Sequence, residues 1–187
     1  MKILLTYALE SECGHIHLPN CEVLHCLTGV GKVSAALSVY EACRHFQPDL
    51  VLGIGTSGSI KHAVGSIVLC STYVDRDLKR ATFAELPYLV DFESIRKANA
   101  FNQTPNGKVS SGDTFLTSTA EADDDSDVYD MEAFGIASAC QRLNIPFVSV
   151  KYVTDRIGEN SIKHWEDKLE DAKNALEAFV NSLTIKL

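Results

Sequence analysis

The chain has 187 residues, of which 45% are hydrophobic and 22% are charged; this is typical of a single globular domain with a sizeable core. Its formal net charge is −8 and it has no long basic run, which excludes a surface built to bind nucleic acid or an anionic membrane. No apolar run approaches the ~20 residues needed to span a bilayer. We therefore expect residues 1–187 to form one domain with no membrane partner.

Apolar stretches alternate with stretches of helical periodicity along the chain, beginning with KILLTYA near the N-terminus. Several apolar stretches are nearly continuous, as in strands that are buried on both faces of a sheet. The expected strands span residues 2–8, 22–29, 49–55, 66–74, 108–113 and 147–155, with a short one at 128–129. Helical spacing of apolar residues predicts helices over 32–46, 131–143 and 165–183.

This alternation predicts an α/β fold, a three-layer α/β/α sandwich with a central, mixed and twisted sheet. The helix at 165–183 carries one apolar stripe and is expected to cover the sheet. Residues 75–107 have the weakest pattern, and we expect a loop with a short helix near 91–100. The acidic run at 121–127 is expected to be solvated surface.

The cysteines and histidines give no metal signature. Six cysteines occur without CxxC spacing, which favours reduced thiols in a cytoplasmic protein. His15 and His17 form an HxH pair, but no third ligand follows at a suitable spacing, so a surface loop is expected. Neither glycine-rich turn, TGVGK at 28–32 or GIGTSGS at 53–59, fits a dinucleotide or P-loop pattern. We expect no metal and no cofactor.

Three acids follow predicted strands at the sheet edge where ligands of open α/β folds gather. Glu12 follows the first strand, Glu132 opens the second helix and Asp155 ends the last strand. An acid at a strand end is more often a helix cap or a surface residue, and the helix dipole alone would stabilise a charge on Glu132. If Glu132 faces a cavity, its carboxylate would suit a ligand with paired hydroxyls, such as a ribose diol.

The chain resembles the nucleoside phosphorylase/nucleosidase superfamily, most closely the 5′-methylthioadenosine/S-adenosylhomocysteine nucleosidases. The resemblance runs in order through MKILLTYALESE, TGVGKVSAA, LGIGTSGSI, VSSGDTFL, VYDMEAFGIASAC and NIPFVSVKYVTD. It implies a homodimeric enzyme without a cofactor. Such an enzyme hydrolyses the N-glycosidic bond of a 5′-modified purine nucleoside and releases the free base.

The resemblance also implies roles for the acids. Asp155 would donate a proton to N7 of the leaving purine, and Glu12 would orient and deprotonate the attacking water. Both are needed because glycoside cleavage passes through an oxocarbenium-like sugar, and positioned acid catalysis is typically worth ~10²–10⁴-fold. Glu132 would accept hydrogen bonds from the ribose hydroxyls.

Five further substrate contacts are implied in the same way. Met131 would pack beneath the sugar, and Thr56 would lie near the sugar and the water. Phe115 would stack on the base, while Leu116 would offer backbone groups to its edge. Val30 would complete the substrate-binding set.

Water is favoured over phosphate as the nucleophile. The resemblance implies that phosphorylases of this superfamily place an Arg three residues before the hydroxyl of the glycine-rich turn. That position is Gly53 here, and no Arg precedes Arg44, so a phosphate would lack a guanidinium fork. A phosphate-dependent phosphorylase nevertheless remains an alternative, as does a relative that binds a nucleoside without turnover.

Departures from the family pattern leave the substrate's 5′-group open. The chain is short between Asp75 and Lys108, Lys151 stands where purine-specific relatives often have Arg, and Asp130 replaces a longer acid. The 5′-substituent could be methylthio, homocysteinyl or the larger group of futalosine.

Overall fold

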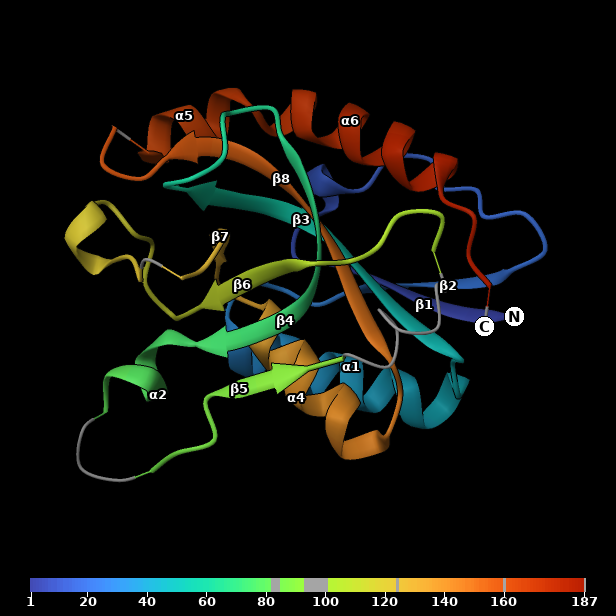
Figure 1. The fold of residues 1–187 in the computed structure, drawn as a ribbon. Coiled ribbons are helices and arrows are strands. Elements are labelled where there is room, and N and C mark those ends of the chain that lie inside the picture. The colour runs from blue at the N-terminus through green and yellow to red at the C-terminus, as the bar shows by residue number, and fades with distance from the viewer. Residues whose placement is uncertain (82–84, 93–100, 124, 160, 187) are drawn as a thin grey trace.

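The computed structural model describes residues 1–187 except 82–84, 93–100, 124, 160 and 187. Within this part of the chain, one mixed eight-stranded sheet has α1 and α4 on one side and α5 and α6 on the other (Figure 1). The predicted α/β layers are therefore confirmed. The strands are β1 (Lys2–Tyr7), β2 (Glu22–Leu27), β3 (Leu50–Ser59), β4 (Ile67–Asp75), β5 (Leu89–Asp91), β6 (Gly107–Ser111), β7 (Val128–Asp130) and β8 (Phe147–Arg156). The helices are α1 (Lys32–Phe46), α2 (Arg76–Arg80), α4 (Ala133–Leu143), α5 (Ser161–Asp167) and α6 (Leu169–Ser182).

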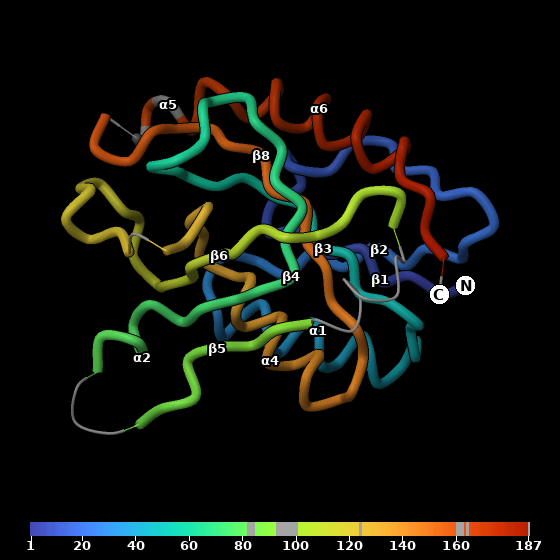
Figure 2. Tube along the Cα trace, viewed as in Figure 1, coloured from blue at the N-terminus to red at the C-terminus, as the bar shows by residue number. Residues whose placement is uncertain are grey.

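The strand pairing closes on itself. β3 pairs with β8 in parallel, β8 with β4 antiparallel, β4 with β6 and β6 with β7 in parallel, and β7 returns antiparallel to β3. β1 and β2 extend the sheet from β3, and β5 pairs along β4. The tube in Figure 2 follows this twisted arrangement and shows the two chain ends lying near each other.

A β-bulge interrupts the longest pairing. β3 and β8 are in register from Val51 opposite Phe147 to Ser57 opposite Val153, after which Gly58 faces Asp155. Thr154 is thus an extra residue on β8. Bulges re-aim side chains and are common beside active sites.

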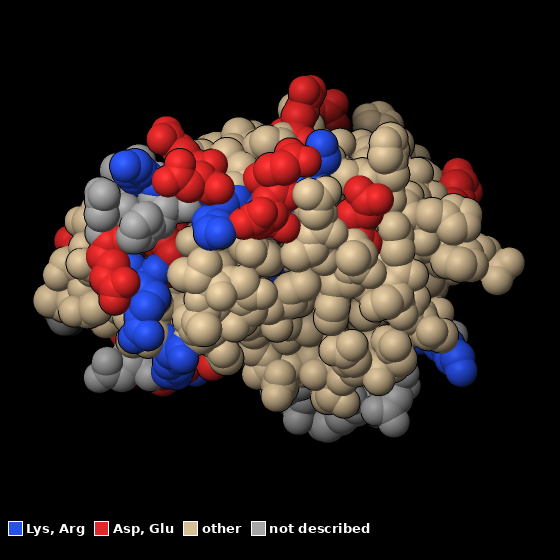
Figure 3. All heavy atoms as spheres, turned by 90° about the horizontal axis from the view of Figure 1, so that it is seen from above, with Lys and Arg blue, Asp and Glu red and all other residues tan. Residues whose placement is uncertain are grey.

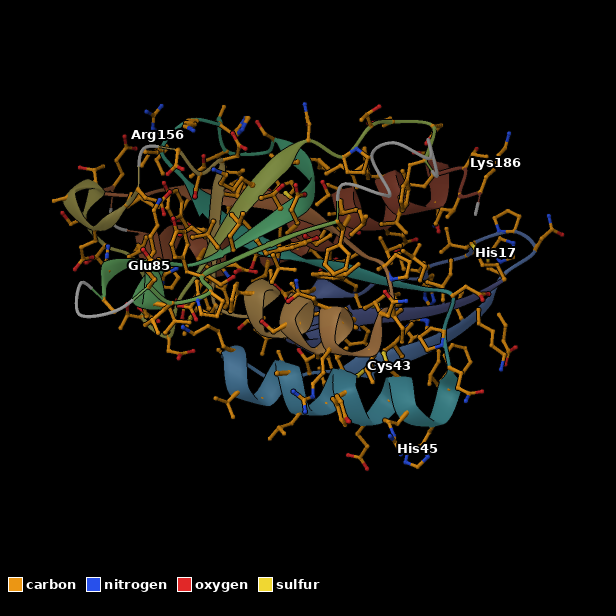
Figure 4. The ribbon with its side chains drawn as sticks, turned by 60° about the horizontal axis from the view of Figure 1, so that its bottom comes forward. His17, Cys43, His45, Glu85, Arg156 and Lys186 are labelled. Carbon is orange, nitrogen blue, oxygen red and sulfur yellow. The ribbon has the colours of Figure 1, made fainter. Side chains whose placement is uncertain are left out.

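Two apolar clusters hold the layers together. On one side, Ala35, Val39 and Cys43 of α1 pack with α4, and Figure 4 shows Cys43 at this helix contact. On the other side, Leu176 and Val180 of α6 are fully buried with residues of β3 and β8. Each fully buried aliphatic side chain of this size stabilises the fold by roughly 1.5–3 kcal/mol.

A glycine brings α4 close to the start of α1. A Cβ at Gly135 would lie 2.2 Å from the carbonyl oxygen of Lys32, so only glycine allows this approach. α1 begins after Gly31, whose φ of 95° favours glycine, and it ends at Gln47 in the left-handed region. The crossing places the turn before α1 beside the residue before α4.

Three details differ from the sequence-based expectations. The predicted helix at 165–183 is two helices, α5 and α6, because the chain breaks at Lys168. The segment at 75–107 contains α2 and the unpredicted strand β5, whereas most of the helix expected near 91–100 lies outside the described residues. The acidic run is not simply solvated, since Ser126 is fully buried and Asp123 accepts a hydrogen bond from Ser110.

The surface carries mainly acidic groups where α6 is exposed. Glu170 and Asp171 are exposed in its first turn, and Figure 3 shows several Asp and Glu side chains on the face seen from above. His17 lies at the opposite end of the molecule from Arg156, which ends β8 (Figure 4). Among the described residues, no group of His, Cys, Asp and Glu could hold a metal ion and no helix could span a membrane.

Candidate active site

A cavity of about 280 Å³ opens where β3, β7 and β8 end, close to the lower limit of ~300–1,000 Å³ for small-molecule sites. It brings together all the site residues predicted from the sequence. They are Glu12, Val30, Thr56, Phe115, Leu116, Met131, Glu132 and Asp155. A second hollow of about 640 Å³, beside Met1 and Leu183, contains none of them.

Glu12 is held by four hydrogen-bond donors. It ends the short 3₁₀ turn Glu10–Glu12, and one carboxylate oxygen accepts from the backbone N–H groups of Ala8 and Leu9, both at 3.2 Å. The other oxygen accepts from the N–H of Thr56 at 2.8 Å and from its hydroxyl at 2.7 Å. Such charge-assisted bonds fix the carboxylate in its buried position.

Trp165 closes this part of the cavity. Its indole N–H donates to Thr56 Oγ1 at 3.0 Å, and that hydroxyl in turn donates to Glu12. The sequence placed Trp165 in the apolar stripe of a helix covering the sheet. That expectation is wrong for Trp165, because the break at Lys168 assigns it to α5, where it lines the cavity.

Glu132 lies at the junction of β7 and α4. Its Oε1 accepts from the backbone N–H of Gly31 at 2.9 Å, across the close approach of α4 to α1. Burial, followed by the negative charge of Asp130, raises the pKa of Glu132 to about 7. The side chain therefore changes protonation near neutral pH.

An ion pair lies beneath the acids. Lys151 Nζ is 2.8 Å from Asp130 Oδ2, and both side chains are almost fully buried. Burial opposes the charge on Lys151, but Asp130 and Glu132 outweigh it and raise the pKa of Lys151 above its ordinary value. A Cβ on Gly55 would lie 3.2 Å from Lys151 Nζ and 3.4 Å from Glu12 Oε1. The positive charge of Lys151 thus attracts the carboxylates of Asp130, Glu132 and Glu12.

Asp155 reaches the cavity from the bulged end of β8. It is 1% exposed, and its Oδ1 lies 2.8 Å from the hydroxyl of Thr154. A Cβ on Gly58 would lie 3.0 Å from Asp155 Oδ2, so glycine on β3 makes room for the carboxyl group.

Phe115 and Leu116 lie in the loop that follows β6. Phe115 is 37% exposed at the cavity, whereas Leu116 is buried and packs with Tyr129 and Ile157. Thr114 and Arg76 line the same part of the cavity. This part is apolar, apart from the guanidinium of Arg76 and the acids of the neighbouring strands.

Sequence reasoning missed Arg76 and Trp165 as site residues. Arg76 directly follows β4, but it lies in the segment 75–107, which has the weakest sequence pattern. Lys151 and Asp130 were noted only as departures from the family, and the structure joins them in one ion pair.

A family model described as the phosphorylase superfamily matches residues 11–184. The chain belongs to the phosphorylase superfamily. The matched residues include all the predicted residues that line the cavity.

Two proteins with sequences similar to this chain carry the same name. A 5′-methylthioadenosine/S-adenosylhomocysteine nucleosidase of Staphylococcus carnosus is 28% identical, and the alignment covers 98% of this chain and 92% of the relative. One of Anoxybacillus flavithermus is 29% identical over 83% of this chain and 77% of the relative.

Solved structures agree on the fold. The Colwellia psychrerythraea nucleosidase of the same name, in complex with adenine, is 25% identical with a TM-score of 0.80, covering 97% of this chain and 93% of that one. Futalosine hydrolase of Helicobacter pylori is 19% identical with a TM-score of 0.80, covering 97% and 96%. At that identity, the second likeness shows the fold alone.

Proposed function

We infer that the chain is a nucleosidase that hydrolyses the N-glycosidic bond of a 5′-modified purine nucleoside and releases the free base. The single observation that carries this inference is the cavity lined jointly by Glu12, Glu132 and Asp155. The related methylthioadenosine/S-adenosylhomocysteine nucleosidases support the substrate class.

The proposed reaction divides the proton transfers between two acids. Water attacks C1′ as the C1′–N9 bond breaks, and Glu12 accepts a proton from that water. Asp155 supplies a proton to N7, so the purine leaves as a neutral base and the sugar keeps the new hydroxyl. Each transfer is worth ~10²–10⁴-fold when the acid or base is positioned, and the four donors to Glu12 supply such positioning.

The remaining residues would hold the two halves of the substrate. Glu132 accepts from the ribose diol, a charge-assisted bond worth roughly 1.5–3 kcal/mol, and Met131 packs beneath the sugar. Thr56 lies beside the water through its bond to Glu12. On the base, Phe115 stacks and Leu116 contributes backbone groups.

Val30 lines the cavity and is 51% exposed, so we propose that it contacts the 5′-end of the nucleoside where the cavity meets solvent. Methylthio and homocysteinyl groups are the first 5′-substituents to test, and the group of futalosine is the third.

Two contacts favour water over phosphate. The N–H and hydroxyl of Thr56 would be natural anion donors, yet Glu12 already accepts from both. Gly53 leaves no room for a cationic side chain, since a Cβ there would lie 3.0 Å from the ring of Phe147. A phosphate dianion would meet a carboxylate at this point.

The deciding experiment follows base release from methylthioadenosine, S-adenosylhomocysteine, adenosine, inosine and futalosine, each with and without phosphate. We expect free purine from a 5′-modified substrate at a rate that phosphate does not change. Release of ribose 1-phosphate would establish a phosphorylase instead, and binding without any product would establish a non-catalytic relative. In Asp155→Asn, turnover should be lost while the fold is kept.

We further propose that the chain forms a homodimer through an apolar surface on β2 and α1, the β2–α1 surface. Val33 and Leu37, one helical turn apart on α1, are 70% and 67% exposed. Leu24 on β2, which faces the same side of the sheet as α1, is also exposed, at 40%. Exposed apolar groups gathered on adjoining elements are typical of an interaction surface.

Sedimentation velocity tests the dimer. The double variant Val33→Asp/Leu37→Asp should sediment as a monomer, whereas Val64→Asp, an exposed apolar residue outside the β2–α1 surface, should remain dimeric. A monomeric wild-type chain would refute the proposal.

The cytoplasmic location expected from the cysteine content stays a prediction.

A further inference from the structure

Arg76 is a buried cation that the proposed reaction does not use. It is the first residue of α2, directly after β4, and is 2% exposed. The side chain of Asp75 accepts from the N–H groups of Asp77 and Leu78 and so fixes the start of α2. Arg76 nevertheless lines the cavity, beside Thr114 and Asp130.

The guanidinium donates to four backbone carbonyls. Nη1 donates to the carbonyl oxygens of Ser110 at 3.1 Å and Asp130 at 3.0 Å. Nη2 donates to the carbonyl oxygen of Gly112 at 3.2 Å and to that of Thr114. The four N–H bonds of the two Nη atoms are thereby used. They join the end of β6, the loop after it and the end of β7.

The fit around the guanidinium is tight. A Cβ on Gly112 would lie 2.5 Å from Arg76 Nε, so the loop can pass over the guanidinium only with glycine at this position. That loop leads directly to Phe115 and Leu116, and β7 leads directly to Met131 and Glu132.

The energetics of this site differ from those of the other buried cation. Lys151 has a carboxylate partner, whereas no carboxylate of the described residues forms an ion pair with Arg76. Burial lowers the pKa of Arg76, although Asp130 opposes this effect. Carbonyl dipoles replace a counter-ion, so the arrangement depends on all four carbonyls remaining in place.

We propose that Arg76 is a positioning residue that sets the base-contacting loop at a fixed separation from the sugar-contacting junction of β7 and α4. This inference rests on the proposed function, because base and sugar are assigned by it. The role explains why one side chain joins these two segments. It also explains why the guanidinium offers no free Nη donor to a ligand.

The test compares Arg76→Gln, Arg76→Lys and Arg76→Ala with Arg142→Gln, which removes an exposed Arg at the end of α4. We expect kcat/KM for methylthioadenosine to fall about 10²-fold in Arg76→Gln, the effect of displacing reacting groups by ~1 Å. Arg76→Lys should keep the charge but not span four carbonyls, so it should recover only part of the loss. Arg142→Gln should match the wild type.

Two measurements separate positioning from a merely structural role. Added guanidinium should restore activity to Arg76→Ala, because the ion can enter from the cavity, whereas added urea should not. Gly112→Ala should reproduce the loss with Arg76 intact, since its Cβ displaces the guanidinium. Folded Arg76 variants that keep wild-type kcat/KM would overturn the proposal, as would a Gly112→Ala variant with unchanged kinetics.

If the proposed nucleosidase function is wrong, the result differs from the one expected if only the role of Arg76 is wrong. In that case the wild-type chain itself would release no base from any nucleoside. Binding of adenine by calorimetry does not depend on hydrolysis, and it should still weaken in Arg76→Gln relative to Arg142→Gln. Equal adenine affinity in the two variants would count against Arg76 even if the chain proved inactive.

Discussion

The two sides of the cavity are built by different means. On the proposed sugar side, Glu12 and Glu132 are held by backbone N–H groups, and the ion pair of Lys151 and Asp130 lies beneath them. On the base side, Phe115 stands on a loop and is 37% exposed. The proposed sugar side is thus fixed by charge and by backbone N–H groups, whereas the loop of the proposed base side is held through its carbonyls by Arg76 and leaves Phe115 at an exposed edge.

This difference indicates how the two sides respond to substitution. A carboxylate that accepts several short hydrogen bonds has little freedom to move, so replacing it removes a specific chemical step. An aromatic ring at an exposed edge contributes area and stacking, and neighbouring groups can adapt to its loss. Five measurements test this view, from the largest expected effect to the smallest.

Glu12→Gln should give the largest loss. The amide keeps the shape of the carboxylate but cannot accept a proton from water, so kcat should fall ~10²–10⁴-fold. KM should change much less, because the sugar and the base keep their contacts. Steady-state assays of adenine release check both values, and a kcat close to that of the wild type would remove Glu12 from the reaction.

Lys151→Met should mainly affect stability. It leaves Asp130 buried without its partner, and breaking a buried pair in this way costs about 3–5 kcal/mol. Urea unfolding gives the free energy. The matched double variant Lys151→Met/Asp130→Asn removes both charges and should recover much of the loss. If the single variant is as stable as the wild type, the ion pair does not support the sugar side.

Activity should depend on pH through Glu132, whose pKa is raised to about 7 by burial and by Asp130. An acid with a raised pKa is protonated below that value, and the protonated form cannot accept from both ribose hydroxyls. We therefore expect kcat/KM to fall about tenfold per pH unit below that pKa. The Glu132→Gln variant should be slower and should lack this inflection; an unchanged inflection would assign it to another group.

The raised pKa of Glu132 also makes the free energy of unfolding depend on pH. Between the ordinary pKa of a glutamate and about 7, the folded chain binds a proton that the unfolded chain has released. The contribution of Glu132 to stability therefore decreases as pH rises through this window. Urea unfolding of the wild type and Glu132→Gln at both ends of the window measures the difference.

Phe115→Ala should have the smallest effect. Aromatic stacking is worth about 0.5–1.5 kcal/mol, which corresponds to a rise in KM of roughly 2–12-fold with kcat little changed. Phe115→Tyr keeps the ring and should behave like the wild type. A large loss of kcat in Phe115→Ala would mean that the base side is as tightly constrained as the sugar side.

Apolar spacing within one segment predicted the helices and strands whose bounds depend mainly on that segment. The spacing of apolar residues gave the bounds of α1 as 32–46, and the structure has the same bounds. Positions at strand ends pointed to Glu12, Glu132 and Asp155, and the resemblance to a known family added the other five predicted cavity residues. Arg76 gave no comparable signal, because its partners are backbone carbonyls, which every sequence possesses.

Trp165 shows a second limit of periodicity. It continues the apolar spacing of Leu169 and Ala172, so one long helix was the simplest interpretation. The helix instead breaks at Lys168, and the indole N–H of Trp165 donates a hydrogen bond to Thr56 on a distant strand. A pattern within one segment cannot report a partner more than a hundred residues away.

The bulge at Thr154 makes the site sensitive to the number of residues in β8. Lys151 and Asp155 occupy one strand at a set separation, and the extra residue between them brings Asp155 opposite Gly58. One inserted or deleted residue here would turn the acid toward the wrong face. The number of residues between Lys151 and Asp155 therefore decides whether both charged groups stay at the cavity.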